Sequence, residues 1–215
     1  LFSVIPDEVK DENDFPKKIK ENNVDGLLLV SKMDDNFILK MREKGIPLVL
    51  VDYYITRESF NCVISDNFWG TYKAIQYLIN LGHKRIGLVN GPQSHPTIRE
   101  RFLGYKQALQ DNGINLPKTY EAGNLRFDGG YRAMSRLLNH RSLPTAIFAV
   151  NDETAIGAMR AIKEKGLKIP EDISIVGFDD IEQSSQTDPP LTTVRVYKED
   201  MGRIAFKKLL EIIDS

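Results

Sequence analysis

Five short, continuous apolar runs recur along the chain, and they constrain its fold more than any other feature of the sequence. A strand with one face in water alternates apolar and polar residues, whereas a strand covered on both faces is apolar throughout. The runs therefore predict buried strands of parallel sheets. They occupy residues 26–30 (GLLLV), 47–51 (PLVLV), 85–89 (RIGLV), 145–150 (TAIFAV) and 173–177 (ISIVG).

Segments with helical spacing separate these runs, and each of them ends at a glycine. Glycine adopts the left-handed backbone conformation that often ends a helix at no steric cost. The regular alternation of strand and helix predicts an α/β fold with right-handed crossovers. The segments cover residues 34–44, 67–81, 97–112 and 151–165, and they are followed by Gly45, Gly82, Gly113 and Gly166; a last helix is expected over residues 199–213.

The strand–helix units are too many for one small sheet, so we expect two lobes. Residues 81–84 are one place where the chain can pass from one sheet to another. The other is 189–193, where two prolines forbid helix and an extended threonine-rich stretch follows. We predict one lobe from residues 1–81 and 193–215, a second lobe from residues 82–192, and a ligand cleft between the two lobes.

Composition excludes several classes of protein. Lys and Arg total 29 against 30 for Asp and Glu, a formal net charge of -1, so this chain has no general attraction to nucleic-acid phosphates. No apolar run approaches the roughly 18–20 residues that span a bilayer, and we expect no membrane association. The single cysteine, Cys62, lies in an apolar run, which predicts a buried thiol in a reducing compartment and favours the cytoplasm.

Polar side chains follow the predicted strands. In open α/β sheets, ligands bind outside the carboxyl ends of the strands. Asp, Asn and Ser also cap helices that follow strands with no ligand involved, so capping alone stays open for each position. Asp152 and Asp180 are the more typical caps. Asn151 and Asp179 come first off their strands and are the better candidates for a ligand. The full set at the strand ends is Ser31, Asp52, Tyr53, Tyr54, Asn90, Asn151, Asp152, Asp179 and Asp180.

Arg101 lies at the edge of the apolar stripe of its predicted helix. That stripe consists of Ile98, Phe102, Tyr105 and Leu109. An arginine beside an apolar stripe is costly unless its guanidinium meets a carboxylate, a diol or another acceptor. Arg101 is therefore a candidate ligand-binding residue. The alternatives are that it extends along apolar surface, or that it pairs with Glu100 or a distant aspartate.

Aromatic side chains accompany these polar groups. Phe68 and Trp69 begin the helix that follows Asp66, and Tyr53 closes a predicted strand. Sugar rings offer apolar faces to aromatic side chains and hydroxyls to Asp, Asn and Arg, so the mixture suits a polyol ligand. Core packing is the alternative for each aromatic taken singly.

Many motifs, in register over nearly the whole chain, resemble the regulatory domain of the lactose/galactose repressor (LacI/GalR) family. One such motif alone is a weak signal, whereas this many in the same order and spacing are specific. They are residues 64–67 (ISDN) with Gly70, 81–86 (LGHKRI), 99–105 (RERFLGY), 144–148 (PTAIF), 151–152 (ND), 157–158 (GA), 169–180 (IPEDISIVGFDD) and 189–194 (PPLTTV).

The resemblance implies a two-lobed fold like that of periplasmic sugar-binding proteins, and it assigns roles to particular residues. Arg101, Asp179 and Asn151 match effector-contacting positions of the family. His95 and Thr97 occupy a loop where some members present ligand-binding side chains. Leu125 stands where several members carry a stacking aromatic, a contact for which Trp69 is the expected substitute. The candidate effector-binding residues are thus Arg101, Asp179, Asn151, Trp69, Phe68, Tyr53, Asp66, His95, Thr97 and Leu125.

The resemblance also implies a homodimeric transcription regulator, most simply a repressor. Its operator DNA would be bound by an N-terminal helix-turn-helix domain that is absent from this chain. Residues 1–5 resemble a strand entered partway, so we expect the natural protein to begin upstream. The expected effector is a sugar or sugar phosphate, with a purine next, and neither a cofactor nor a metal is expected.

Two other functional classes stay open. An exported solute-binding protein of a sugar transporter shares the architecture, and a signal peptide or lipid-attachment cysteine upstream would identify it. An enzyme with a doubly wound fold is the other alternative. Against it, the sequence has no phosphate loop, no complete GxGxxG and no nucleophile elbow. His83, His95 and His140 are dispersed, without the spacing of a metal site.

Overall fold

The computed structural model describes residues 15–21, 23–117, 121–122 and 124–215. The chain divides into two compact units: unit 1 consists of Leu1–Ser65 and Tyr197–Ser215, and unit 2 of Asp66–Val196. The strand expected at residues 1–5 lies outside the described residues. Within the described part, every helix is too short or too polar to span a membrane. The predicted cleft stays a prediction.

Unit 1 contains a parallel sheet in which the described strands have the order β1-β2-β3. Leu29 and Leu50 of this sheet pack with Phe37 and Met41 of α2 in one buried cluster, and α8 packs against the same sheet. The elements are α1 (Lys17–Lys20), β1 (Leu27–Val30), α2 (Asp35–Glu43), β2 (Leu48–Val51), β3 (Cys62–Val63) and α8 (Lys198–Ile213).

Cys62 is exposed, so the predicted buried thiol is wrong. Its strand, β3, has only two residues and lies at the edge of the described sheet, where it pairs with β2 alone. The apolar run that contains Cys62 has only three residues, 62–64, and a run this short does not mark a covered strand.

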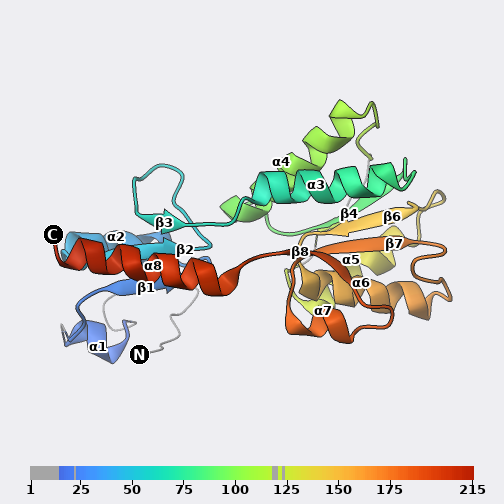
Figure 1. Cartoon of the computed structure of the whole chain (residues 1–215). Helices are drawn as coiled ribbons and strands as arrows, with labels where there is room; N and C mark the ends of the chain where they lie inside the picture. The colour runs from blue at the N-terminus through green and yellow to red at the C-terminus, as the bar shows by residue number, and fades with distance from the viewer. Residues whose placement is uncertain (1–14, 22, 118–120, 123) are drawn as a thin grey trace. The chain divides into compact units, whose positions relative to one another are not determined.

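Unit 2 contains a parallel sheet with the order β5-β4-β6-β7-β8. Figure 1 shows α3 and α4 on one face of this sheet and α5 and α6 on the other. The strands are β4 (Ile86–Asn90), β5 (Glu121–Ala122), β6 (Ala146–Ala149), β7 (Ser174–Asp179) and β8 (Thr192–Arg195), and the helices are α3 (Asn67–Asn80), α4 (Pro96–Asp111), α5 (Phe127–Leu137), α6 (Asp152–Glu164) and α7 (Glu182–Gln186).

The strands β4, β6 and β7 of unit 2 are buried on both faces, as their continuous apolar sequences predict. Leu88 and Phe148 point into the cluster that α3 and α4 cover. Val89 and Ile147, their neighbours in sequence, point into the cluster under α5 and α6. The α/β fold with parallel sheets flanked by helices is therefore confirmed.

The glycines predicted to end helices do so. Gly45, Gly82, Gly113 and Gly166 follow α2, α3, α4 and α6, with φ angles of 73°, 94°, 65° and 80°. A side chain at any of the four would meet no atom within 4 Å. The feature that these glycines share is thus backbone conformation and not close packing, which is the role of a glycine just past a helix.

The boundary between the units differs from the predicted one. The chain enters unit 2 at Asp66, not at residue 82, so α3 belongs with the second sheet. The reason is packing: Ile75 and Leu78 of α3 join Tyr105 of α4 in one core. At the second crossing, β8 completes the sheet of unit 2 and the chain leaves only after Val196.

Helix α5 was not predicted, and its packing explains both the helix and its unusual sequence. It contains Gly129 and Gly130, which lower helix propensity. A Cβ at Gly130 would lie 2.1 Å from the Thr154 carbonyl oxygen, and one at Gly157 would lie 2.0 Å from the Phe127 carbonyl oxygen. The glycines therefore allow α5 and α6 to approach at backbone distance.

We predict that Gly157→Ala destabilises the chain by about 1–3 kcal/mol or more, because the added methyl group meets backbone atoms that cannot move aside. The matched control is Gly202→Ala in α8, where a Cβ meets nothing within 4 Å. Alanine should stabilise that helix by up to about 1 kcal/mol. Urea unfolding followed by circular dichroism measures both changes. Equal stability of the two variants would contradict the packing described.

Candidate functional site

Arg101 is held from several sides at the carboxyl edge of the sheet of unit 2. Its side chain is buried, with 3% of the residue exposed. The guanidinium donates through Nη1 to the Val150 carbonyl oxygen at 2.7 Å, just beyond β6. Its Nη2 lies 3.1 Å from Oδ1 of Asp179, the last residue of β7. The carboxylate partner that the sequence requires for this arginine is therefore the candidate residue Asp179.

Two further partners of Arg101 were not predicted. Its Nε donates to the Oδ1 atom of Asn67 at 2.8 Å. The guanidinium carbon lies 3.7 Å from the centre of the Phe178 ring, a cation–π contact. In the sequence, Asn67 is explained as the first residue of a helix and Phe178 as part of an apolar strand, so neither stands out as a partner of Arg101. Only the fold brings them together.

Asp179 and Asp180 both have left-handed backbone conformations, with φ angles of 112° and 49°. Such angles are uncommon for residues other than glycine, and they persist where surrounding contacts hold them. Asp179 faces Arg101. The Asp180 carboxylate accepts a hydrogen bond from Nε of Arg195 at 2.5 Å, in the neighbouring strand β8. The pair of aspartates thus turns the chain so that one carboxylate faces the arginine of α4 and the other faces β8.

Asp152 anchors this turn, and the expectation that it caps a helix is wrong. Its buried carboxylate accepts hydrogen bonds from the Ile181 backbone N–H at 3.0 Å, the Ser184 hydroxyl at 2.7 Å and the Thr193 hydroxyl at 2.6 Å. Gly177 leaves room for it, because a Cβ there would lie 2.2 Å from its Oδ1. Asp152 therefore joins the segment after β7 to β8.

Asn151 is the residue that caps α6. Its Oδ1 accepts from the Thr154 backbone N–H at 3.0 Å, and the Thr154 hydroxyl oxygen accepts from the Asn151 N–H. Its Nδ2 donates to the Leu125 carbonyl oxygen at 2.9 Å. Asn151 lies beside Val150, the acceptor of Arg101, so it belongs to the same edge. Its side-chain amide bonds to Thr154 and Leu125 and so holds the segment before α5 at that edge.

Leu125 has a φ angle of 64°, which is strained for a residue with a bulky side chain. Its side chain fills the space over Gly91, where an added Cβ would lie 2.4 Å from Leu125 Cδ2. Together with the hydrogen bond from Asn151, this contact holds the segment before α5 against the end of β4. The position therefore presents an aliphatic surface.

His95 and Thr97 lie at the start of α4 and are both buried. The Thr97 hydroxyl and Nδ1 of His95 share a hydrogen bond of 2.9 Å. Further along the helix, the Tyr105 hydroxyl donates to the Ile86 carbonyl oxygen at 2.7 Å. Burial raises the pKa of Tyr105 well above its usual range, so this donor stays protonated. These contacts fix α4, and Arg101 with it, against β4.

Aromatic side chains cluster on the first turns of α3. Trp69 is 53% exposed, and its ring meets Phe68 edge-on with 5.3 Å between ring centres. Tyr72, which was not predicted, contacts both rings. Asp66 caps the helix by accepting the Trp69 backbone N–H at 3.0 Å. The exposed indole is therefore presented on a rigid helix start.

Tyr53 belongs to the core of unit 1. Its hydroxyl donates to Oδ1 of Asp35 at 2.5 Å. Burial, and then the neighbouring Asp35 carboxylate, raise the pKa of Tyr53 well above its usual range. Of the ten predicted residues, the other nine lie in unit 2.

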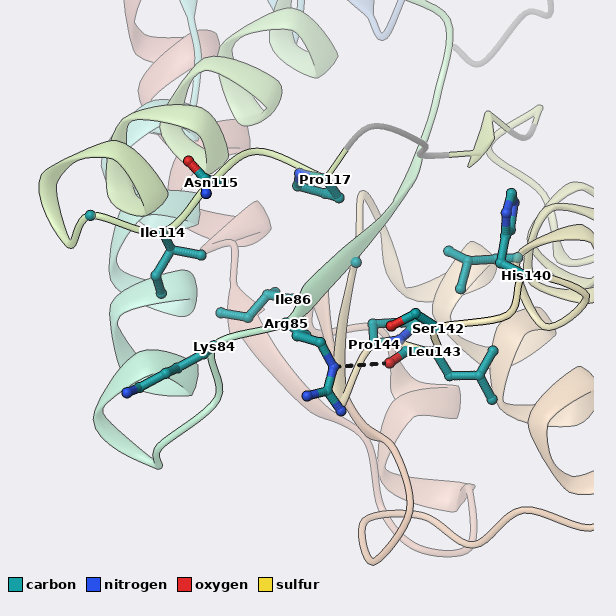
Figure 2. Close-up of a pocket in the computed structure, with 13 residues that line it drawn as sticks. Lys84, Arg85, Ile86, Ile114, Asn115, Pro117, His140, Ser142, Leu143 and Pro144 are labelled. Atoms are coloured by element: carbon teal, nitrogen blue, oxygen red, sulfur yellow. Dashed lines mark hydrogen bonds between the residues drawn. The ribbon is translucent and has the colours of Figure 1, made fainter.

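A surface pocket of about 510 Å³ lies at the opposite edge of the sheet of unit 2 (Figure 2). Arg85 stands in it, with its Nε donating to the Leu143 carbonyl oxygen at 3.3 Å. Ile86 and Gly87, which also line it, begin strand β4, whereas the Arg101 network lies where β6 and β7 end. None of the ten predicted residues lines this pocket, so it is distinct from the candidate site.

Known proteins similar to the chain agree with this picture. Residues 75–215 match the family model of the periplasmic binding protein-like domain. The chain is 36% identical over 197 residues to the HTH-type transcriptional repressor PurR of Klebsiella pneumoniae subsp. pneumoniae, which covers 90% of the chain and 58% of that repressor. The chain thus spans less than two thirds of the length of the curated relatives it matches.

Solved structures give the same result. A regulatory protein of the LacI family from Chloroflexus aggregans has a TM-score of 0.84 and 33% identity, covering 92% of this chain and 72% of that one. The transcriptional regulator CelR in a cellobiose complex has a TM-score of 0.86 and 33% identity, covering 91% of this chain and 61% of that one. The likeness extends over both units.

We predict that Arg101→Met lowers the free energy of unfolding by about 3–5 kcal/mol, because it leaves Asp179 and the Val150 carbonyl without their buried partner. The matched control is Arg126→Met, which removes an arginine of an exposed ion pair with Glu153 in the same unit. Exposed pairs of this kind contribute about 0–1 kcal/mol. Urea unfolding followed by the fluorescence of Trp69, the single tryptophan, compares the two. A small loss for Arg101→Met would show that its contacts are not formed in solution.

Proposed function

Because the chain belongs to the LacI family of transcriptional regulators, as a periplasmic binding protein-like domain, we propose that it is the effector-sensing domain of a DNA-binding repressor. The observation that carries the proposal is the convergence of Arg101, Asp179 and the cap residue Asn151 at one edge of one sheet. This edge is where open α/β sheets bind ligands.

The proposed effector is a sugar or sugar phosphate. Arginine and aspartate side chains fixed by a rigid surrounding can donate to and accept from several hydroxyls without reordering. The exposed Trp69 supplies an aromatic face of the kind that packs on sugar rings. A similar regulator, CelR, has been solved as a cellobiose complex. A purine is the second candidate, since the same polar side chains suit it.

Regulation by this domain requires different effector affinities in two conformations of the protein. A ligand that binds both conformations equally shifts nothing, and a coupling of roughly 1–3 kcal/mol is ordinary for allosteric proteins. Operator DNA would be bound by a helix-turn-helix domain outside this chain, as the description of the relatives as HTH-type repressors suggests. Such a regulator acts in the cytoplasm. An exported solute-binding protein and an enzyme are disfavoured, because the relatives are repressors.

The partner in solution is proposed to be a second copy of the chain. Helix α8 of unit 1 buries Ala205 and Leu209 but leaves an apolar stripe exposed. This α8 stripe consists of Phe206, Leu210 and Ile213, spaced four and three residues apart on one flank of the helix. The most exposed of the three is Phe206, at 54%. An exposed stripe of this kind is typical of an interface.

Effector binding is expected to appear as thermal stabilisation. We propose to screen D-glucose, D-glucose 6-phosphate, D-cellobiose, D-galacturonate, adenosine and hypoxanthine. A compound at 100 times its dissociation constant adds about 2.7 kcal/mol to stability. Asp179→Asn should abolish the shift, because it removes the charged acceptor at the edge. Asp128→Asn, in the exposed pair with Arg132 of the same unit, should preserve it. Equal responses of the two variants would refute the site.

Self-association is expected to depend on the α8 stripe. Phe206→Glu should convert a dimer into a monomer, because a carboxylate cannot be buried in an apolar contact without a large desolvation cost. Tyr77→Glu is the control, since Tyr77 is a half-exposed aromatic on α3, in unit 2. Sedimentation velocity measures both variants. A dimer that survives Phe206→Glu would place the interface elsewhere.

A further inference from the structure

Asn90 is a buried amide without a hydrogen-bond partner in the described part of the chain. It is the last residue of β4, and 1% of it is exposed. Neither its Oδ1 nor its Nδ2 makes a hydrogen bond to any described residue. Buried side-chain amides almost always have partners, and those that do not require an explanation. A donor and an acceptor in one side chain are both left unpaired here.

The alternation of β4 places this amide in the layer that holds Arg101. Asn90 lies on the same face of the sheet as Ile86 and Leu88, two and four residues before it, which pack under α3 and α4. Because Val89 pairs with Ala149 of β6, Asn90 stands beside Val150. The Val150 carbonyl is the acceptor of Arg101. Asn90 therefore belongs to the carboxyl edge that carries the candidate site.

Nearby polar groups are already engaged. Arg101 donates to Asn67 and Val150 and faces Asp179, and Thr97 bonds to His95. On the other side, Gly91 is packed against the side chains of Leu125 and Ile98. Asn90 is thus the polar group at the end of β4 that no other described residue satisfies.

We propose that Asn90 binds a vicinal diol of the effector, an inference that rests on the proposed function and narrows its ligand. One hydroxyl accepts a hydrogen bond from Nδ2, and the neighbouring hydroxyl donates to Oδ1, which satisfies both halves of the amide. A phosphate offers acceptors and leaves Oδ1 unpaired. A nucleobase edge offers both groups, but the surface next to Gly91 is formed by the aliphatic side chains of Leu125 and Ile98 and not by an aromatic ring.

The test is Asn90→Leu, which keeps the shape of the side chain and removes both polar atoms. Without ligand, the variant should melt at a higher temperature than the wild type, because an unsatisfied amide has been replaced by an apolar group. For the sugar of the panel that binds the wild type, the dissociation constant should rise at least tenfold. These two opposite changes distinguish a ligand-binding amide from one that a fixed internal water satisfies.

Thr71→Val is the matched control. Thr71 is also fully buried in unit 2, on α3, and its hydroxyl has no partner among the described residues. Replacing this hydroxyl by a methyl group should likewise raise the melting temperature. It should leave the sugar affinity unchanged, because Thr71 lies a full turn beyond the start of α3 and not at a strand end.

Sugar analogues complete the test. Each deoxy analogue lacks one hydroxyl of the sugar. The analogue that lacks a hydroxyl contacted by Asn90 should bind the wild type weakly, and the substitution Asn90→Leu should weaken its binding little further. A lower melting temperature of Asn90→Leu without ligand, or an unchanged dissociation constant, overturns the assignment of Asn90 alone. Tighter binding of hypoxanthine than of any sugar overturns the diol. If no compound stabilises the wild type, the proposed function itself fails.

Discussion

The organisation of unit 2 depends on one buried cation. The guanidinium of Arg101 is removed from water, and such a group is tolerated only when its charge and its N–H donors are compensated. The compensation comes from four places at once: Asn67 of α3, the carbonyl after β6, the carboxylate that ends β7, and the ring of Phe178. Because α4 carries the arginine, this residue ties two helices and two strands together at the edge where a ligand is expected.

The carboxylate of Asp152 is a second buried polar group of unit 2, and its hydrogen bonds are separate from those of Arg101. Among the described residues, Asp152 forms no ion pair, and its carboxylate is held by three hydrogen bonds, from Ile181, Ser184 and Thr193. These bonds fix the segment that leaves β7 and the strand through which the chain leaves unit 2. Asp179 and Asp180 stand between the two systems, one carboxylate on Arg101 and the other on Arg195. Binding of a ligand at Asp179 would therefore act on a turn that is bonded to β8 through Asp180 and Arg195. Strand β8 ends next to the boundary between the units.

Local patterns predicted what depends on local chemistry. The five strands and four helix ends follow from apolar runs and left-handed glycines, which need no knowledge of the rest of the chain. Three features, the placement of α3, the helix α5 and the cap of α6, were misassigned or missed because packing decides them. The apolar face of α3 could cover either sheet, so its place in unit 2 was not readable. The glycine pair of α5 suppresses helix propensity until the α6 backbone is present. Asn151 and Asp152 are adjacent polar residues, and only the position of Ser184 and Thr193 shows which one caps the helix.

The candidate residues are easiest to recognise where they satisfy no local rule. Arg101 stood out because its charge lies beside an apolar stripe, and its partner Asp179 has a backbone angle that its residue type disfavours. The same holds in unit 1, where Ser31 and Asp52 adopt left-handed angles directly after β1 and β2. Strained residues at the carboxyl ends of strands persist only when other contacts over-determine them. Asn90 is the complementary case, since its backbone is an ordinary strand and its side-chain amide lacks hydrogen-bond partners among the described residues. A sensor needs both kinds of residue. Residues held by several contacts keep the charges of the site in place, and at least one polar group is left for the ligand to satisfy.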